Sequence, residues 1–195
     1  MPVLPPLGDA VPQRGNAFSR WFGRTLLRLL GWRVVGEVPN IPKCVVIGAP
    51  HTSNWDFVVA MGAKLGMGID VRFLGKDTLF RPPLGWLMRR LGGTPVDRSV
   101  PRGAVAQAVA QFEQHERFYL GLSPEGTRKR VEQWRTGFYH IAHAAGVPIL
   151  PFYFDFPSRT FGLGPLVHPT GDLGADVARL RAFYAPFTGK NPELG

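Results

Sequence analysis

The chain has 195 residues, of which 45% are hydrophobic and 19% are charged, and its formal net charge is +9. This length suits one domain with a full hydrophobic core, and the composition excludes a chain that is mainly disordered. A single cysteine, Cys44, excludes an internal disulfide bond. A surface this basic attracts anionic partners, but we expect no nucleic acid among them, because no basic run is interleaved with aromatic residues.

The first predicted element is an amphipathic helix at residues 16–31, which follows a proline-rich stretch at 1–15 that we expect to be a flexible arm. Arg20, Arg24 and Arg28 recur every four residues, and aromatic and leucine side chains fill the rest of the helix surface. Such a helix is too short and too charged to span a bilayer, but it can lie in the lipid interface with its arginines on anionic headgroups. The same pattern fits a helix packed on the domain, and both interpretations can hold for different faces.

From residue 32 onward, predicted strands alternate with predicted helices. We expect strands at 32–38, 43–48, 70–75, 94–96, 118–122, 147–154 and 159–167, and helices at 54–67, 82–91, 101–115, 137–145 and 172–184. This alternation predicts an α/β fold with a mostly parallel central sheet flanked by helices, preceded by the N-terminal amphipathic helix. Active sites in such folds gather beyond the carboxyl ends of the strands, so polar residues that directly follow a strand are the candidates for function.

The strand at 43–48 is followed by a histidine and an aspartate five positions apart, His51 and Asp56. Histidine is the side chain that best takes a proton near neutral pH, and a carboxylate beside it fixes the tautomer and stabilises the charged ring. Five residues along one helix turn the chain by about 140° net. The two side chains therefore meet only if His51 precedes the helix and Asp56 lies in its first turn, a boundary at which Ser53 is a good N-cap.

The same residues also support a purely structural interpretation. Ser53 and Asp56 match a capping box, in which Asp56 accepts a hydrogen bond from a backbone amide at the start of the helix. A carboxylate has two oxygens, so capping and catalysis are compatible with each other. The spacing alone leaves both interpretations open.

The strand at 118–122 is followed by the run Ser123 to Arg128, which combines a turn, an acid, a hydroxyl and a guanidinium. Arginine binds phosphate through a planar fork of donors, and Gly126 lets backbone amides approach an anion closely. Glu125 can accept a hydrogen bond from a substrate hydroxyl or hold an arginine. The alternative is a surface turn with a Glu–Arg pair, which contributes little.

Two further groups of residues are weaker candidates. Arg98 follows the short strand at 94–96, where a neighbouring Asp–Arg pair is common without any function. His140 and His143 lie one helical turn apart, but no glutamate or cysteine stands nearby at ligand spacing. We therefore predict no metal site.

In this order, the segments resemble four sequence blocks of the glycerolipid acyltransferase family, and most closely its bacterial 1-acyl-glycerol-3-phosphate acyltransferases. The blocks lie between residues 49 and 151. They are His51-x-Ser53-x-x-Asp56 (the HX4D motif of the family), Val96-Asp97-Arg98, Pro124-Glu125-Gly126-Thr127-Arg128 and Val147-Pro148-x-x-Pro151. The chain departs from the family pattern at Pro50, where asparagine is frequent, and at Lys129, where serine is frequent.

The resemblance implies an O-acyltransferase of phospholipid biosynthesis, which moves a fatty acyl group from a coenzyme A or acyl-carrier-protein thioester to the hydroxyl of a lysophospholipid. The implied acceptor is 1-acyl-glycerol-3-phosphate, and the implied product is phosphatidate. The resemblance assigns catalysis to His51 and Asp56, and substrate binding to Ser53, Arg98, Glu125, Gly126, Thr127 and Arg128. It implies no metal ion and no cofactor beyond acyl-CoA or acyl carrier protein as co-substrate.

On this resemblance, residues 32–195 are the acyltransferase domain and residues 16–31 are a membrane-associating helix. The expected partners are a membrane surface with anionic lipids, the lysolipid acceptor and an acyl carrier protein. The expected location is the cytoplasmic face of the inner (plasma) membrane, as a peripheral protein. Two alternatives stay open: acylation of another lysolipid, such as a lyso-ornithine lipid, and a lipid-binding module without catalysis.

Overall fold

The computed structural model describes residues 4–96 and 101–194, which form an α/β fold around one seven-stranded sheet. The order of the strands across the sheet is β1-β7-β6-β2-β5-β3-β4. All neighbouring strands are parallel except β6 and β7, so the predicted mostly parallel sheet is confirmed. The strands are β1 (Arg33–Val35), β2 (Lys43–Ala49), β3 (Val71–Lys76), β4 (Gly93–Val96), β5 (Phe118–Leu122), β6 (Ile149–Asp155) and β7 (Thr160–Leu163).

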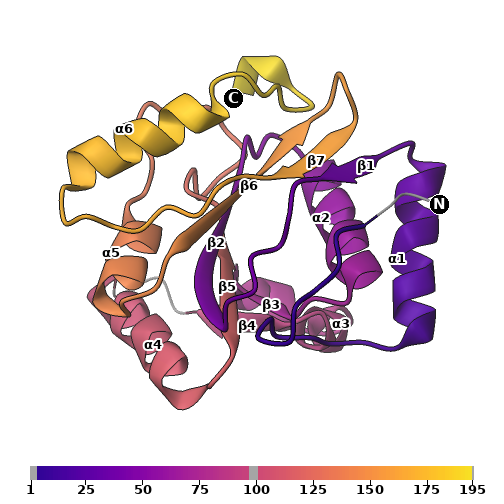
Figure 1. The fold of residues 1–195 in the computed structure, drawn as a ribbon, viewed down its shortest axis with the longest axis horizontal. Coiled ribbons are helices and arrows are strands. Elements are labelled where there is room, and N and C mark those ends of the chain that lie inside the picture. The colour runs from indigo at the N-terminus through magenta and orange to yellow at the C-terminus, as the bar shows by residue number, and fades with distance from the viewer. Residues whose placement is uncertain (1–3, 97–100, 195) are drawn as a thin grey trace.

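Helices cover both faces of the sheet, with α1 and α2 on one face and α4, α5 and α6 on the other (Figure 1). The α-helices are α1 (Ala17–Leu29), α2 (Asn54–Met67), α3 (Gly85–Arg90), α4 (Pro101–Gln114), α5 (Gly137–Ala144) and α6 (Leu173–Tyr184), and two short 3₁₀ helices are η1 (Asp77–Phe80) and η2 (Pro192–Leu194). Side chains of β2 alternate between the two layers, since Val45 and Ile47 pack with α4–α6 and Cys44 and Val46 pack with α1 and α2. A strand covered on both faces is apolar at nearly every position, which explains the continuous apolar run of β2.

The segment before α1 packs on the domain, in contrast to the predicted flexible arm. Val11 is fully buried in the same core layer as α1 and α2. The backbone carbonyl of Pro12 accepts a hydrogen bond from Asp70 N at 2.8 Å, and Arg14 N donates to Gly68 O at 2.8 Å. The prediction for residues 1–15 is therefore wrong for this part of the segment, because its carbonyls and amides pair with the chain just before β3.

Helix α1 has one face against the domain and one face in solvent. Gly23 lies so close to α2 that a Cβ atom at this position would come within 2.3 Å of Gly66 N. The opposite face exposes apolar side chains, namely Phe18, Trp21, Phe22 and Leu29. Within residues 4–96 and 101–194, the helices are all too short or too polar to cross a membrane.

Candidate active site

The turn between β2 and α2 brings His51 and Asp56 together. Ser53 is the N-cap of α2, so His51 precedes the helix and Asp56 lies in its first turn, as the spacing requires. His51 Nδ1 lies 3.0 Å from Asp56 Oδ2. The histidine side chain is 28% exposed, whereas the aspartate side chain is 1% exposed. The carboxylate therefore contacts the ring from the interior of the protein.

Asp56 is also the acid of a capping box, which confirms the capping interpretation, and the same carboxylate contacts His51. Its Oδ2 atom accepts hydrogen bonds from Thr52 N and Ser53 N, each at 2.8 Å. Ser53 Oγ donates to Asp56 Oδ1 at 3.2 Å and accepts from Trp55 N at 3.0 Å. An ionised carboxylate only accepts hydrogen bonds, so the proton between the two side chains belongs to His51 Nδ1. The lone pair of the imidazole is then on Nε2.

A second acid, Glu125, ties the end of β5 to the histidine turn. Its Oε2 atom accepts a hydrogen bond from His51 N at 2.8 Å, and the side chain is buried. Burial raises the pKa of Glu125, and the hydrogen bond from His51 N partly opposes this rise. Glu125 was predicted to meet a substrate hydroxyl or an arginine, but in the structure its hydrogen-bond partner is the backbone amide of His51.

The turn after β5 presents basic side chains to the same cavity as His51. Arg128 is exposed and lines this cavity together with Gly126 and Thr127. Arg135 lines it as well, and its side chain crosses Gly126, where a Cβ atom would lie 2.7 Å from Arg135 Cδ. Gly126 has a φ of +65°, so both its backbone conformation and this close approach require glycine.

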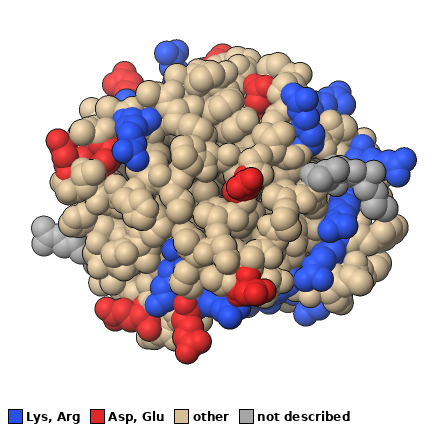
Figure 2. Space-filling view, viewed as in Figure 1, with Lys and Arg blue, Asp and Glu red and all other residues tan. Residues whose placement is uncertain are grey.

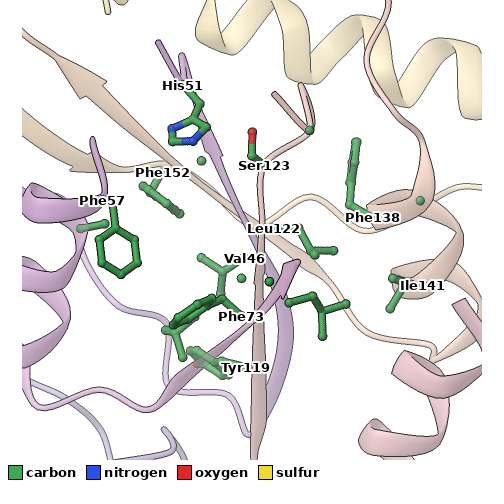
Figure 3. A pocket seen from close by; sticks show the side chains of 18 of the residues that line it. Val46, His51, Phe57, Phe73, Tyr119, Leu122, Ser123, Phe138, Ile141 and Phe152 are labelled. Carbon is green, nitrogen blue, oxygen red and sulfur yellow. The ribbon is translucent and has the colours of Figure 1, made fainter. Parts of the chain in front are cut away.

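A large apolar cavity of about 1950 Å³ extends from the histidine into the fold. This volume exceeds the roughly 300–1,000 Å³ of ordinary ligand pockets. Figure 3 shows the rings of His51 and Phe57 and the Ser123 hydroxyl at the cavity, with Phe73 and Tyr119 farther from the histidine. Ser123 Oγ is buried and has no hydrogen-bond partner within the described residues. The geometry therefore joins a proton acceptor to an extended apolar space.

Lys64 on α2 also lines the cavity, and its ammonium group is held by backbone carbonyls. Lys64 Nζ donates to Val71 O at 2.7 Å and to Leu91 O. Burial lowers the pKa of Lys64 to about 8. The carbonyl contacts tie α2 to β3 and to the end of α3.

Comparison with known families decides the classification. The family model described as Acyltransferase matches residues 33–155. This chain belongs to the acyltransferase family. The matched segment contains His51, Asp56 and the run from Pro124 to Arg128, whereas the described residues after 155 lie beyond it.

Relatives whose sequences align with most of this chain are consistent with the family. The 1-acyl-sn-glycerol-3-phosphate acyltransferase of Escherichia coli (strain K12) is 31% identical over 165 residues, which cover 80% of this chain and 65% of that protein. The protein of the same name from Pseudomonas aeruginosa (strain PAO1) is 29% identical over 190 residues, covering 87% of this chain and 72% of the relative. The chain thus spans only 65% of the length of the Escherichia coli relative.

A solved structure shares the fold of this acyltransferase-family protein. The crystal structure of the 1-acyl-sn-glycerophosphate (LPA) acyltransferase PlsC from Thermotoga maritima superposes with a TM-score of 0.62 at 21% sequence identity. The similar region covers 86% of this chain and 75% of the solved chain. At this identity, the likeness concerns the fold alone.

The structure places most, but not all, of the predicted site residues around one cavity. His51, Asp56, Gly126, Thr127 and Arg128 line it, whereas the Ser53 hydroxyl is engaged within the turn. Arg98 lies outside the described residues. Arg135 was not among the predicted site residues, because its only signal in the sequence is a basic side chain two positions before α5.

Proposed function

We propose that this protein transfers a fatty acyl group from a coenzyme A or acyl-carrier-protein thioester to the hydroxyl of 1-acyl-glycerol-3-phosphate, giving phosphatidate. The observation that carries the proposal is the His51–Asp56 pair, whose imidazole lines a large apolar cavity that Arg128 and Arg135 also line. The names of the relatives support the choice of acceptor.

In the proposed reaction, His51 Nε2 removes the proton of the acceptor hydroxyl as its oxygen attacks the thioester carbonyl carbon. The carbon–sulfur bond then breaks, and the thiolate leaves and takes up the proton from the imidazolium. Asp56 holds the ring and stabilises its positive charge while the proton resides there. A thiolate is already a good leaving group, so the step needs no covalent acyl-enzyme, metal ion or cofactor.

The buried Ser123 hydroxyl is placed to assist this step. Its Oγ atom is unpaired within the described residues, and Ser123 lines the same cavity as His51 (Figure 3). A donor aimed at the carbonyl oxygen stabilises the negative charge that develops there. Ser123→Ala then lowers kcat by about 10²-fold, the effect of one such donor, and leaves the KM values nearly unchanged.

In the proposed complex, arginines at the cavity hold the phosphate of the acceptor. Arg128 and Arg135 both line the cavity and are exposed enough to meet a charged ligand, and Arg98 is proposed to join them. The absence of a side chain at Gly126 leaves room for Arg135 in this pocket. Thr127 adds a hydroxyl, and Glu125 fixes the turn by accepting a hydrogen bond from the His51 amide. Phosphate binding positions the hydroxyl for attack, which supplies much of the rate.

The fatty acyl chain occupies the apolar part of the cavity. Side chains of α2, β3 and β5 line this part, among them Phe57, Phe73 and Leu122. Each methylene group that leaves water contributes roughly 0.8 kcal/mol, so a long chain binds strongly without polar contacts. The predicted contribution of the helix at 54–67 is consistent with Phe57 and Met61 in this lining.

We also propose peripheral binding to anionic lipid at the cytoplasmic face of the inner membrane. Figure 2 shows basic side chains gathered at the edge of the molecule that α1 forms. Helix α1 exposes Trp21 and Phe22 beside these arginines, and α3, whose Met88 lines the cavity, exposes Trp86. Trp21→Ala/Phe22→Ala should lower binding to anionic vesicles about tenfold or more, since each buried aromatic ring contributes roughly 1.5–3 kcal/mol. Unchanged cosedimentation with the vesicles would remove α1 from the proposed membrane surface.

The proposed reaction is tested with purified protein, a panel of lysolipids and both classes of thioester donor. Release of free thiol and mass spectrometry of the lipid product are followed for wild type, His51→Ala and the matched control His143→Ala, an exposed histidine on α5. We expect phosphatidate from wild type and the control, and a loss of about 10²–10⁴-fold in His51→Ala. Equal rates in all three proteins, or no thiol release with any lipid, would refute it.

Variants of the two arginines distinguish an acceptor that carries a phosphate from one that does not. Arg128→Ala and Arg135→Ala should raise the KM for 1-acyl-glycerol-3-phosphate about tenfold or more each, because a charge-assisted bond to phosphate contributes roughly 1.5–3 kcal/mol. If these variants leave the acceptor KM unchanged, the acceptor is a lysolipid without phosphate, such as a lyso-ornithine lipid. If wild type binds lipid but releases no thiol, the protein is a binding module.

A further inference from the structure

The C-terminal segment returns to the histidine turn, although it lies beyond the residues matched by the acyltransferase family model. Asn191 Nδ2 donates to Thr52 O at 2.9 Å, and Asn191 N donates to Thr52 Oγ1 at 3.2 Å. Thr52 is 2% exposed and directly follows His51. In Figure 1 this yellow segment lies near the end of the sheet at which β2 leads into the turn.

Neighbouring contacts fix the segment on both sides of Asn191. Thr188 N donates to Asp155 Oδ1 at 3.2 Å, which attaches the segment to the end of β6. Lys190 Nζ lies 4.7 Å from the centroid of the Trp55 ring in the first turn of α2. Gly189 packs so tightly that a Cβ atom there would lie 2.6 Å from Thr52 Oγ1. The segment is therefore seated on the turn by side-chain, backbone and packing contacts together.

We propose that Asn191 is a positioning residue, which holds the His51–Asp56 pair in its reactive geometry through hydrogen bonds to Thr52. We call these two bonds, from Asn191 Nδ2 to Thr52 O and from Asn191 N to Thr52 Oγ1, the clasp. This inference rests on the proposed function, since it assigns a role in the same reaction. Thr52 N donates to Asp56 Oδ2, the same atom that holds His51 Nδ1, while Asn191 holds the carbonyl and hydroxyl of Thr52. The turn lies between a strand and a helix, so no ladder of backbone bonds fixes it.

The contact between Asn191 and Thr52 should affect the catalytic rate of the enzyme–substrate complex and not the binding of the substrates. None of residues 187–194 lines the cavity, so removal of the clasp changes no substrate contact. A misplacement of about 1 Å in a reacting group costs up to about 10²-fold in rate. Loss of the clasp should thus lower kcat and leave the KM values of donor and acceptor unchanged.

The test compares Asn191→Ala and Asn191→Asp with the matched control Glu193→Ala, an exposed residue of the same segment. Asn191→Ala loses the bond from Nδ2 to Thr52 O and keeps the backbone donor to Thr52 Oγ1, so kcat should fall about tenfold, the scale of one lost hydrogen bond, with KM values within about twofold. Asn191→Asp also loses the donor to Thr52 O and should show a similar loss, whereas Glu193→Ala should match wild type. A rise in KM without a fall in kcat would overturn the proposal.

Hydrogen exchange of the Thr52 and Ser53 amides gives a readout that does not depend on turnover. Both amides donate to Asp56, so release of the clasp should speed their exchange about tenfold in Asn191→Ala and not in Glu193→Ala. Exchange in β2 should stay unchanged. Unchanged exchange at the two amides, or acceleration spread over β2, would overturn the clasp. If wild type releases no thiol, the proposed function fails while this measurement still decides the role of Asn191.

Discussion

Two buried aspartates in this protein are held in nearly the same way. Asp56 and Asp176 lie in the first turns of α2 and α6, and they are 1% and 3% exposed. One oxygen of Asp56 accepts from two backbone amides and faces the His51 ring. One oxygen of Asp176 accepts from Thr170 N at 2.7 Å, Thr170 Oγ1 at 2.9 Å and Tyr139 Oη at 2.9 Å. The two carboxylates differ mainly in the ring that each one holds.

That difference separates a pair that faces the cavity from a pair that is buried in the core. His51 lines the cavity, and its side chain is 28% exposed. Tyr139 is buried in the core of α5 and α6, and burial followed by its bond to Asp176 raises its pKa above the ordinary value. A phenol of this kind stays protonated in the range in which enzymes work. Burial and hydrogen bonding alone therefore do not mark an aspartate as functional. The identity of its partner, and whether that partner is accessible to a ligand, must also be known.

The largest expected effect that tests this comparison is the loss of activity in Asp56→Asn. An asparagine whose carbonyl oxygen replaces Oδ2 keeps the bonds from Thr52 N, Ser53 N and His51 Nδ1, so the geometry of the turn is retained. The negative charge that stabilises the imidazolium is lost. We expect kcat to fall by about 10²–10⁴-fold, measured as thiol release at saturating substrates. Full activity in a variant whose unfolding temperature is unchanged would show that Asp56 only caps the helix.

Asp176→Asn should produce the opposite result, a loss of stability with activity retained. The amide of this variant cannot supply a charged acceptor to Thr170 and Tyr139, so the free energy of unfolding should fall by roughly 1–3 kcal/mol. Urea unfolding measures this change, and kcat per folded molecule should equal that of wild type. A loss of kcat at full stability would mean that α6 influences the histidine turn more directly than its distance in the sequence suggests.

The pH dependence of stability sharpens the same comparison. Burial acts to raise the pKa of Asp176, but the bonds from Thr170 and Tyr139 outweigh burial and lower it below its ordinary value of about 3.9. A carboxyl group with a lowered pKa in the folded state stabilises above the unfolded value, and this stabilisation is lost as the pH falls through the folded value. The difference in unfolding free energy between wild type and Asp176→Asn should therefore shrink from pH 6 towards pH 2. A constant difference would contradict the charged contacts of Asp176.

Local patterns in the sequence predicted the elements and the contact between His51 and Asp56, because both depend on residues close together in the chain. The boundary at Ser53 and the five-residue spacing place His51 and Asp56 correctly without any long-range information. The predicted helix at 54–67 coincides with α2. The contact of Asn191 with Thr52 spans 139 residues, and the approach of Arg135 to Gly126 depends on the path of an irregular loop. Neither leaves a periodic or motif signal, so only the three-dimensional structure shows them.

The smallest expected effect concerns Glu125, which holds the histidine turn through a backbone amide rather than through the ring. Burial raises the pKa of Glu125, so the folded state binds its proton more readily than the unfolded state does. Wild-type stability should thus fall as the pH rises from the unfolded value of about 4.3 through the folded value. Glu125→Gln keeps an oxygen acceptor for His51 N without a charge.

Glu125→Gln should therefore be more stable than wild type at pH 7 by about 1 kcal/mol or less, and the gain should vanish near pH 4. Its kcat should stay within about threefold of wild type, whereas Glu125→Ala, which loses the acceptor for His51 N, should lose about tenfold. Urea unfolding at several pH values and thiol release measure the two effects. If Glu125→Gln is as inactive as Glu125→Ala, the charge itself acts in the reaction, and Glu125 belongs with Asp56 rather than with Asp176 in the comparison.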